Sequence, residues 1–187
     1  AFEAAGLEWQ IITCDVESGR IAEAVAGAAA MGFRGCLLAG PLRQAVLPLV
    51  ASATPTAQFA GGAGLLERVE GGFAGHMTDG RGVIEALRAH VDPAGRNLLV
   101  LGAGLPARAA ALELALAGAE RIGIAGPHAE LATTLVADLT GVHAQPVELV
   151  PWGERLAIPA DVGIVVRATD ACLPLEGLRS EIVFADL

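Results

Sequence analysis

The sequence contains no lysine, and its 12 basic residues are all arginines. A guanidinium stays charged in proteins, so none of these side chains is suited to give up and take back a proton. The arginines face 21 acidic residues, which leaves a net charge of −9. Because negative charge repels a phosphate backbone, the composition argues against a nucleic-acid partner. The plainer explanation of the charge is that it keeps the protein soluble.

Long apolar runs are also missing, although hydrophobic residues make up 53% of the chain. Arg, Glu, Gly or Pro interrupts every run before it reaches the roughly 18 residues of a membrane span, so we expect no membrane insertion and an apolar core. The segment Ala1–Gln10 has acidic residues and no basic residue ahead of its apolar positions. That pattern is unlike a signal peptide, and a cytoplasmic location is expected.

Cysteine is scarce, and Cys14, Cys36 and Cys172 are odd in number and far apart. They form no CxxC pair, and the histidines lack metal-ligand spacing, so no metal site is expected. No Ser, Cys or His arrangement predicts a nucleophile. Because each cysteine lies in or beside an apolar segment, we expect reduced, buried thiols.

The first ninety residues alternate between strand-like and helix-like segments. Apolar and β-branched content predicts strands at 9–16 and 35–39, and helical spacing of apolar residues predicts helices at 21–31, 42–51 and 83–90. The dipeptide Gly71-Gly72 predicts a hairpin between 67–69 and 73–74. A polar turn, Asp92-Pro93-Ala94-Gly95, marks a boundary, so two domains are expected, over 1–92 and 93–187.

Beyond residue 92 the alternation becomes regular. The predicted strands are 97–101, 121–125, 146–149, 162–166 and 182–185, and the predicted helices are 106–117 and 129–139. This order is typical of an α/β fold with a parallel, Rossmann-like sheet covered by helices. Ligands of such sheets bind outside the carboxyl ends of the strands, so the loops after Leu101, Ala125 and Val166 should face one crevice. We therefore expect a small-molecule site between the two domains.

A glycine-rich turn follows the first of these strands. The segment Gly102-Ala103-Gly104 joins an apolar strand to an Ala/Leu-rich helix. Two close glycines let the backbone bend sharply and expose N–H groups and the positive helix end to a pyrophosphate. The turn predicts NAD or NADP as cofactor. Leu105 adds bulk beside it, and Pro106 removes one potential N–H donor.

Several segments resemble the shikimate dehydrogenase family. The sequence GHMTDGRG at 75–82 resembles the family's G-x-N-T-D-G-x-G segment, and 32–49 is similar to its strand, P-H-K turn and helix. Phe2–Trp9 and the VRAT of 166–169, which aligns with the family's N-A-T, also fit. The resemblance covers nearly the whole chain. It implies a substrate domain followed by a cofactor domain, and NAD(P)-dependent interconversion of a cyclic alcohol and ketone of the shikimate type in aromatic amino acid biosynthesis.

The resemblance also implies site residues. The family's catalytic lysine maps to Arg43 and its aspartate to Asp79, and Thr78 and Asp79 would contact substrate. Arg43 would hold a carboxylate or stabilise charge on a carbonyl oxygen instead of moving a proton. The residues themselves leave two plainer roles open, an N-terminal helix cap for Asp79 and an ordinary exposed helix position for Arg43. The implied cofactor contacts are Gly102, Ala103, Gly104, Leu105, Pro106, Ala107, Arg108, Ala168 and Thr169.

Several family side chains that bind hydroxyl groups are replaced. Leu37, Ala39, Gly64 and Met77 stand where the family has Asn, Thr, Asn and Asn. Each polar group left unpaired costs on the order of 1 to 3 kcal/mol, so tight binding of shikimate is not expected. Either the site has been remade for a less polar ligand, or the chain is a catalytically inactive homologue that binds ligands, regulates or serves as a scaffold.

The cofactor end departs from the family as well. The family's N-R-T, whose arginine holds the 2′-phosphate of NADP, is replaced by Gly126-Pro127-His128, so NAD and NADP both stay open. His128 either touches a phosphate or is merely solvated. Arg167 either fills the crevice or pairs with Asp170. The family also has a serine-containing loop before the position of Ala1 and a helix after Leu187, so both domains are expected to be incomplete at those ends.

Overall fold

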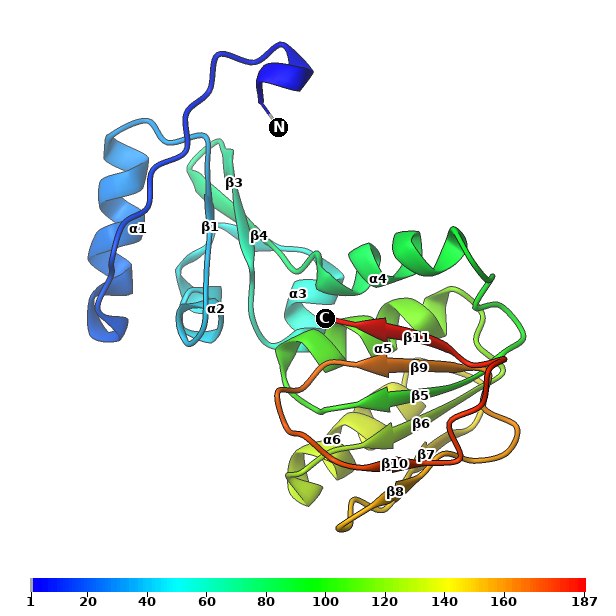
Figure 1. The fold of residues 1–187 in the computed structure, drawn as a ribbon. Coiled ribbons are helices and arrows are strands. Elements are labelled where there is room, and N and C mark those ends of the chain that lie inside the picture. The colour runs from blue at the N-terminus through cyan, green and yellow to red at the C-terminus, as the bar shows by residue number, and fades with distance from the viewer. Residues whose placement is uncertain (1) are drawn as a thin grey trace.

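Two β-sheets with their helices make up the computed structural model, which describes residues 2–187 (Figure 1). The first sheet has the strand order β1-β3-β4-β2, and β3 and β4 form the expected hairpin around Gly71. Gly71 has a φ of 82°, a left-handed value that glycine adopts without strain. The strands are β1 (Gly35–Leu37), β2 (Ser52–Ala53), β3 (Leu65–Val69) and β4 (Gly72–His76).

Short helices and 3-10 turns precede and follow these strands in the sequence, and the last of them, α4, packs in the core of the second sheet. Val46, Leu66 and Phe73 are almost fully buried and form part of the core of the first sheet. The helix predicted over 42–51 is split, because Pro48 has no N–H to continue it. The sequence interpretation missed α3, which Thr54 caps by accepting the Ala57 N–H at 3.3 Å. The helical segments are 3-10 turns at Glu3–Ala5, Ser18–Arg20 and Leu47–Leu49, and α1 (Ile21–Ala30), α2 (Leu42–Ala45), α3 (Pro55–Ala60) and α4 (Asp79–Arg88).

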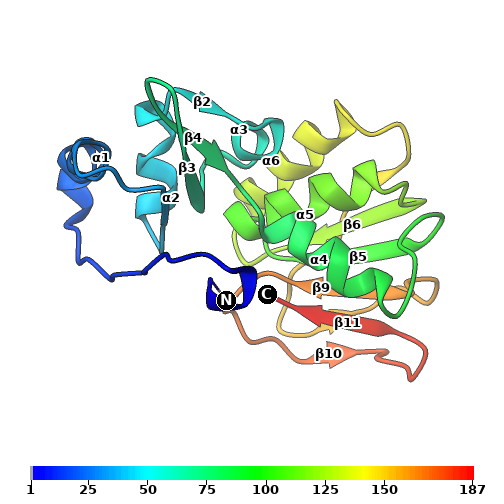
Figure 2. The ribbon, with the colours of Figure 1, turned by 90° about the horizontal axis from the view of Figure 1, so that it is seen from above.

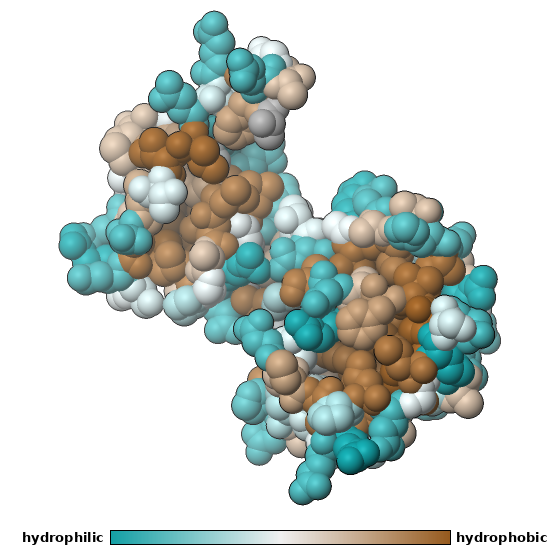
Figure 3. Space-filling view, in the orientation of Figure 1, coloured by the Kyte–Doolittle hydropathy of each residue, from teal (hydrophilic) through white to brown (hydrophobic). Residues whose placement is uncertain are grey.

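The strand predicted at 9–16 is wrong. This segment forms neither helix nor strand, and Trp9, Ile11 and Ile12 are 47%, 70% and 60% exposed. A strand needs a neighbour to receive its hydrogen bonds, and within residues 2–187 β1 pairs only with β3. β-branched content alone therefore did not produce a strand. Figure 3 shows hydrophobic surface in two places, beside α1 and β1 and over the second sheet.

The second sheet is parallel throughout and has the order β11-β9-β5-β6-β7, which confirms the expected α/β fold class. Its strands and helices lie within two residues of their predicted limits. They are β5 (Asn97–Leu101), β6 (Arg121–Ala125), β7 (Val147–Leu149), β9 (Ile164–Arg167), β11 (Val183–Asp186), α5 (Leu105–Leu116) and α6 (Ala129–Thr140).

Both faces of this sheet are covered, as parallel sheets require. Leu98 and Val100 of β5 pack in the cluster that includes α5 and α6, whereas Leu99 packs in a second cluster on the other face. A short parallel pair that the sequence did not predict, β8 (Leu156–Ala157) and β10 (Leu175–Glu176), contributes to that second cluster. Within residues 2–187, no helix is both long and apolar enough to cross a membrane.

Contacts of α3 and α4 with α5 join the two sheets (Figures 1 and 2). The α3–α5 contact includes a hydrogen bond from Thr56 Oγ1 to Glu113 at 2.7 Å. In the α4–α5 contact, Gly80 lies directly against the backbone of Ala109. Helix α4 begins at Asp79 rather than at the predicted Val83, because a glycine in its first turn permits this close approach. The two sheets are thus held together through packed helices.

All three cysteines are free, but the expectation that they are buried is wrong. Cys14 is exposed because the segment 9–16 has no strand partner, and Cys172 is exposed in the loop after β9. Cys36 in β1 is half-buried.

Replacing Gly80 by alanine should destabilise the protein. The new Cβ would lie 2.3 Å from the carbonyl oxygen of Ala109, so α4 and α5 must separate. Overpacking of this kind costs about 1 to 3 kcal/mol, which urea unfolding would measure. Gly82→Ala in the same helix is the matched control, because a Cβ there meets nothing within 4 Å, and it should be neutral or slightly stabilising. Equal losses in both variants would contradict a close α4–α5 contact.

The three thiols should differ in reactivity. Burial, and to a smaller extent the nearby Cys14, raises the pKa of the Cys36 thiol. A raised pKa leaves less of the reactive thiolate at about pH 8, so iodoacetamide should modify Cys36 more slowly than the exposed Cys14 and Cys172. Peptide mass spectrometry over a time course gives the order of modification. Labelling of Cys36 at the same rate as the other two would show that its surroundings do not shield it.

Candidate active site

Arg43 and Asp79 come from different elements and meet in an ion pair. Arg43 lies in α2, and Asp79 is the first residue of α4. Arg43 Nη1 donates to Asp79 Oδ2 at 2.9 Å, and Arg43 Nε donates to the carbonyl oxygen of Leu38 at 2.9 Å. The two side chains are 29% and 21% exposed, so Arg43 is not an ordinary exposed helix residue.

Asp79 stands at the start of α4, where the positive end of the helix favours a carboxylate. Thr78 precedes it in the N-cap position, is exposed and makes no capping hydrogen bond with its side chain. The Asp79 carboxylate is used by Arg43, so capping does not account for this residue. Among the described residues, Asp79 Oδ1 and Arg43 Nη2 have no hydrogen-bond partner.

Beyond its two hydrogen-bond partners, the guanidinium of Arg43 has Gly64 and Met77 as neighbours without polar side chains. An ideal Cβ on Gly64 would lie 3.7 Å from Arg43 Cζ and 3.8 Å from Met77 Sδ, and Met77 itself is 4% exposed. A hollow of about 310 Å³ opens beside the guanidinium. It is lined by Gly40, Pro41, Arg43, Gln44, Leu105 and Pro106.

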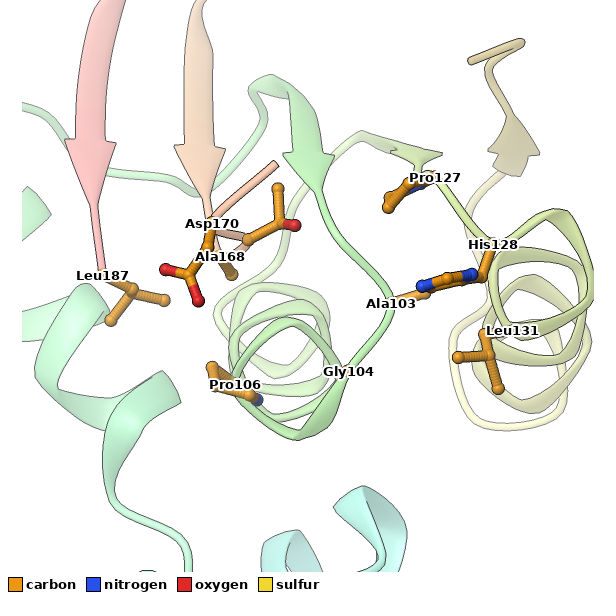
Figure 4. Close-up of a pocket in the computed structure, with 10 residues that line it drawn as sticks. Ala103, Gly104, Pro106, Pro127, His128, Leu131, Ala168, Asp170 and Leu187 are labelled. Atoms are coloured by element: carbon orange, nitrogen blue, oxygen red, sulfur yellow. The ribbon is translucent and has the colours of Figure 1, made fainter. Parts of the chain in front are cut away.

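A second hollow of about 310 Å³ lies at the carboxyl ends of β5, β6 and β9 (Figure 4). The loops after these three strands all contribute to it, which confirms the expected crevice. Pro106 lines both hollows, so the two adjoin. The lining residues are Ala103, Gly104, Pro106, Pro127, His128, Leu131, Ala168, Thr169, Asp170 and Leu187.

The two glycines of the turn after β5 do different work. Gly102 has a φ of 119°, and a Cβ there would lie 2.5 Å from the carbonyl oxygen of Ala168, so only glycine fits. Gly104 has ordinary extended backbone, and a Cβ on it would enter open space at the start of α5. Its bare backbone therefore leaves room for an anionic group to approach the first N–H groups of the helix. These residues fit the pyrophosphate of a dinucleotide.

Other residues expected at the cofactor lie elsewhere. Leu105 lines the hollow of Arg43 rather than the second one, and Ala107 is completely buried. Arg108 donates to the carbonyl oxygen of Phe59 at 2.7 and 3.1 Å and to Asp138 at 2.7 Å, so its guanidinium fastens α5 to α3 and α6. It does not line the hollow.

The sequence interpretation also mistook one ion pair and missed some lining residues. Arg167 pairs with Asp186 at 2.8 Å, not with Asp170, because the parallel register of β9 and β11 sets residues 167 and 186 side by side. Asp170 instead faces the second hollow, together with Leu131 and Leu187 (Figure 4). Asp170 and Leu187 follow β9 and β11, and Leu131 lies near the start of α6, so their places at the carboxyl ends of the strands could have identified them as lining residues. Within residues 2–187, no group of three His, Cys, Asp or Glu side chains is placed to hold a metal ion.

No family model matches this sequence. Among curated proteins, the shikimate dehydrogenase (NADP(+)) of Citrifermentans bemidjiense is 42% identical over 127 residues, which cover 67% of this chain and 44% of that protein. The shikimate dehydrogenase (NADP(+)) of an Anaeromyxobacter species is 35% identical over 193 residues, which cover 98% of this chain and 69% of that protein.

Among solved structures, ligand-free 5-ketofructose reductase of Gluconobacter sp. strain CHM43 is 35% identical with a TM-score of 0.91, over 99% of this chain and 70% of that one. The chain spans about half the length of the first curated relatives it matches. The motifs, the two sheets and these relatives agree, and the chain belongs to the shikimate dehydrogenase family.

Proposed function

We propose that this chain carries the site of an NADP-dependent oxidoreductase that interconverts a cyclic alcohol and the corresponding ketone. The proposal rests on one observation, which is that the two hollows lie next to each other. Arg43, which pairs with Asp79, lines one of them, and Gly104 lines the other, with Pro106 lining both. A substrate beside the ion pair would therefore lie next to a dinucleotide bound at the start of α5.

The chemistry follows from the free atoms of the pair. During oxidation, Asp79 Oδ1 accepts the hydroxyl proton of the alcohol while the hydride on the same carbon leaves. Arg43 Nη2 donates a hydrogen bond to the substrate oxygen and stabilises the negative charge that develops on it. NADP supplies the hydride acceptor for oxidation or the donor for reduction. Arg43 holds charge and leaves proton transfer to Asp79, because its guanidinium stays protonated.

Residues 1–92 form the substrate side of this proposed enzyme and residues 93–187 its cofactor side. The turn at Gly102 to Gly104 would hold the pyrophosphate, and Ala168 and Thr169 would border the rest of the dinucleotide. NADP is favoured because the curated relatives carry NADP(+) in their names. The residues that follow β6, Gly126-Pro127-His128, include neither the acidic side chain that binds the ribose of NAD nor the arginine that holds the 2′-phosphate of NADP, so they do not separate the two cofactors.

A second candidate function is a catalytically inactive homologue that binds ligands or acts as a scaffold. Arg43 stands at the position of the family's proton-exchanging lysine, which favours this alternative. The replacement of hydroxyl-binding residues by Leu37, Ala39, Gly64 and Met77 points the same way. This candidate predicts that the protein binds NADP and turns over no ketone.

Placing a carboxylate in the proposed pyrophosphate site should abolish dinucleotide binding without unfolding the protein. Gly104→Asp puts a negative charge at the start of α5, where aspartate is also a good N-cap residue, so the free energy of unfolding should hold or rise. Gly104→Ser is the matched control with a neutral cap. Isothermal titration with NADP should show binding to the serine variant and none to the aspartate variant. Equal affinities in both would place the dinucleotide elsewhere.

Removing the proposed base should stop turnover and spare cofactor binding. Asp79→Asn keeps the shape of the side chain but removes the carboxyl group that gives the ketone oxygen its proton in reduction and takes it back in oxidation, so kcat should fall by about 10²- to 10⁴-fold while the Kd of NADPH stays unchanged. The assay follows NADPH oxidation with 3-dehydroshikimate, 5-ketofructose and 3-oxocyclohexane-1-carboxylate. Glu120→Gln, at an exposed position without a side-chain hydrogen bond among the described residues, is the control.

The same assay separates the two candidate functions. Turnover of any of these ketones by the wild-type protein, lost in Asp79→Asn and kept in Glu120→Gln, supports the oxidoreductase. NADPH binding without turnover of any ketone supports the inactive homologue. Turnover that survives Asp79→Asn at its full rate would assign proton transfer to another group.

A further inference from the structure

Arg43 and Gln44 are the polar side chains among the residues that line the hollow beside Arg43. Arg43 Nε donates to Leu38 and one N–H of Nη1 donates to Asp79, so both N–H groups of Nη2 are free donors. Asp79 Oδ1 is the free acceptor beside it. A ketone oxygen accepts from a free donor, and an alcohol hydroxyl both accepts from such a donor and donates to the free acceptor.

The remaining wall of this hollow is mostly apolar. Pro41 lies on one side, and Leu105 and Pro106 at the start of α5 lie on the other, with Gln44 as the one further polar side chain that lines it. Leu105 lies close to Gly62, which precedes Gly64 and β3 in the sequence, since an ideal Cβ on Gly62 would lie 2.9 Å from Leu105 Cδ2. Leu105 therefore packs against Gly62 and adds apolar surface to the hollow.

The segment just before Gly40, which is the first residue that lines the hollow, is apolar as well. Leu37 and Ala39 lie two residues apart, so they share one side of the segment, and both are exposed, Leu37 at 72%. Leu38 between them packs against the core of the first sheet, and its carbonyl oxygen holds Arg43. Leu37 and Ala39 thus present apolar surface, and they stand where the family has Asn and Thr.

We infer that the site takes a sparsely hydroxylated cyclic ketone or alcohol, polar at the reacting carbon and apolar over the rest of its ring. The inference rests on the proposed function and specifies its substrate class. Each additional hydroxyl would give up its hydrogen bonds to water without gaining a partner on this wall, which costs on the order of tenfold in affinity. Apolar ring surface would instead be buried against Pro41, Leu105 and Pro106.

The test compares two ligands that differ in hydroxylation. Shikimate has three hydroxyl groups on its ring, and 3-hydroxycyclohexane-1-carboxylate has one, while both keep the carboxylate. Their affinities for the NADP-loaded protein are measured by isothermal titration. The mono-hydroxylated ligand should bind at least tenfold more tightly. Tighter binding of shikimate would overturn the inference and leave the proposed oxidoreductase standing, whereas binding of neither ligand would overturn both.

A variant that restores polar partners gives an independent arm. Leu37→Asn combined with Ala39→Thr changes two exposed positions, so folding should be unaffected. Its preference for the mono-hydroxylated ligand should shrink by about fivefold or more, since each hydrogen bond regained contributes close to that factor. Leu116→Asn, at a leucine on α5 that is 69% exposed, controls for a polar residue at an exposed site. A preference unchanged in the double variant would overturn the inference.

Discussion

The contact between α4 and α5 is the constraint on which the site depends. Gly80 lies against the backbone of Ala109, and the residue before it, Asp79, is therefore fixed beside the start of α5. Arg43 then reaches Asp79 from α2, and its Nε is held by a carbonyl oxygen of the first sheet's connecting segment. The close approach at Gly80 thus brings Asp79 of the ion pair near α5, the helix that begins directly after Gly104.

Arg43 occupies the position of the family's lysine and still pairs with Asp79, but it differs from a lysine in its chemistry. A lysine exchanges protons when its surroundings lower its pKa, whereas a guanidinium keeps its charge and directs several donors at once. Arg43 uses two nitrogens on Asp79 and Leu38 and has a third left for a ligand. In the proposed enzyme, one residue holds charge and the other moves the proton, in a hollow that is otherwise mostly apolar.

Much of the second sheet could be predicted from the sequence, because its buried parallel strands are continuous apolar runs with turn residues between them. Predictions failed where the outcome depends on a distant partner. The segment 9–16 has strand-like composition but no neighbour, α4 starts early because Gly80 packs on α5, and Arg167 pairs across strands with Asp186. The meeting of Arg43 and Asp79 was expected from family resemblance, since residues 36 apart in the sequence carry no local signal of contact.

The most direct measurement of the central claim is hydride transfer itself. NADPH carrying deuterium at the transferred position is incubated with the protein and a panel of cyclic ketones, and the alcohol products are analysed by NMR. The account predicts deuterium on the carbinol carbon of the sparsely hydroxylated product with the wild-type protein, and none with Asp79→Asn. Bound NADPH that transfers no deuterium to any ketone would contradict it.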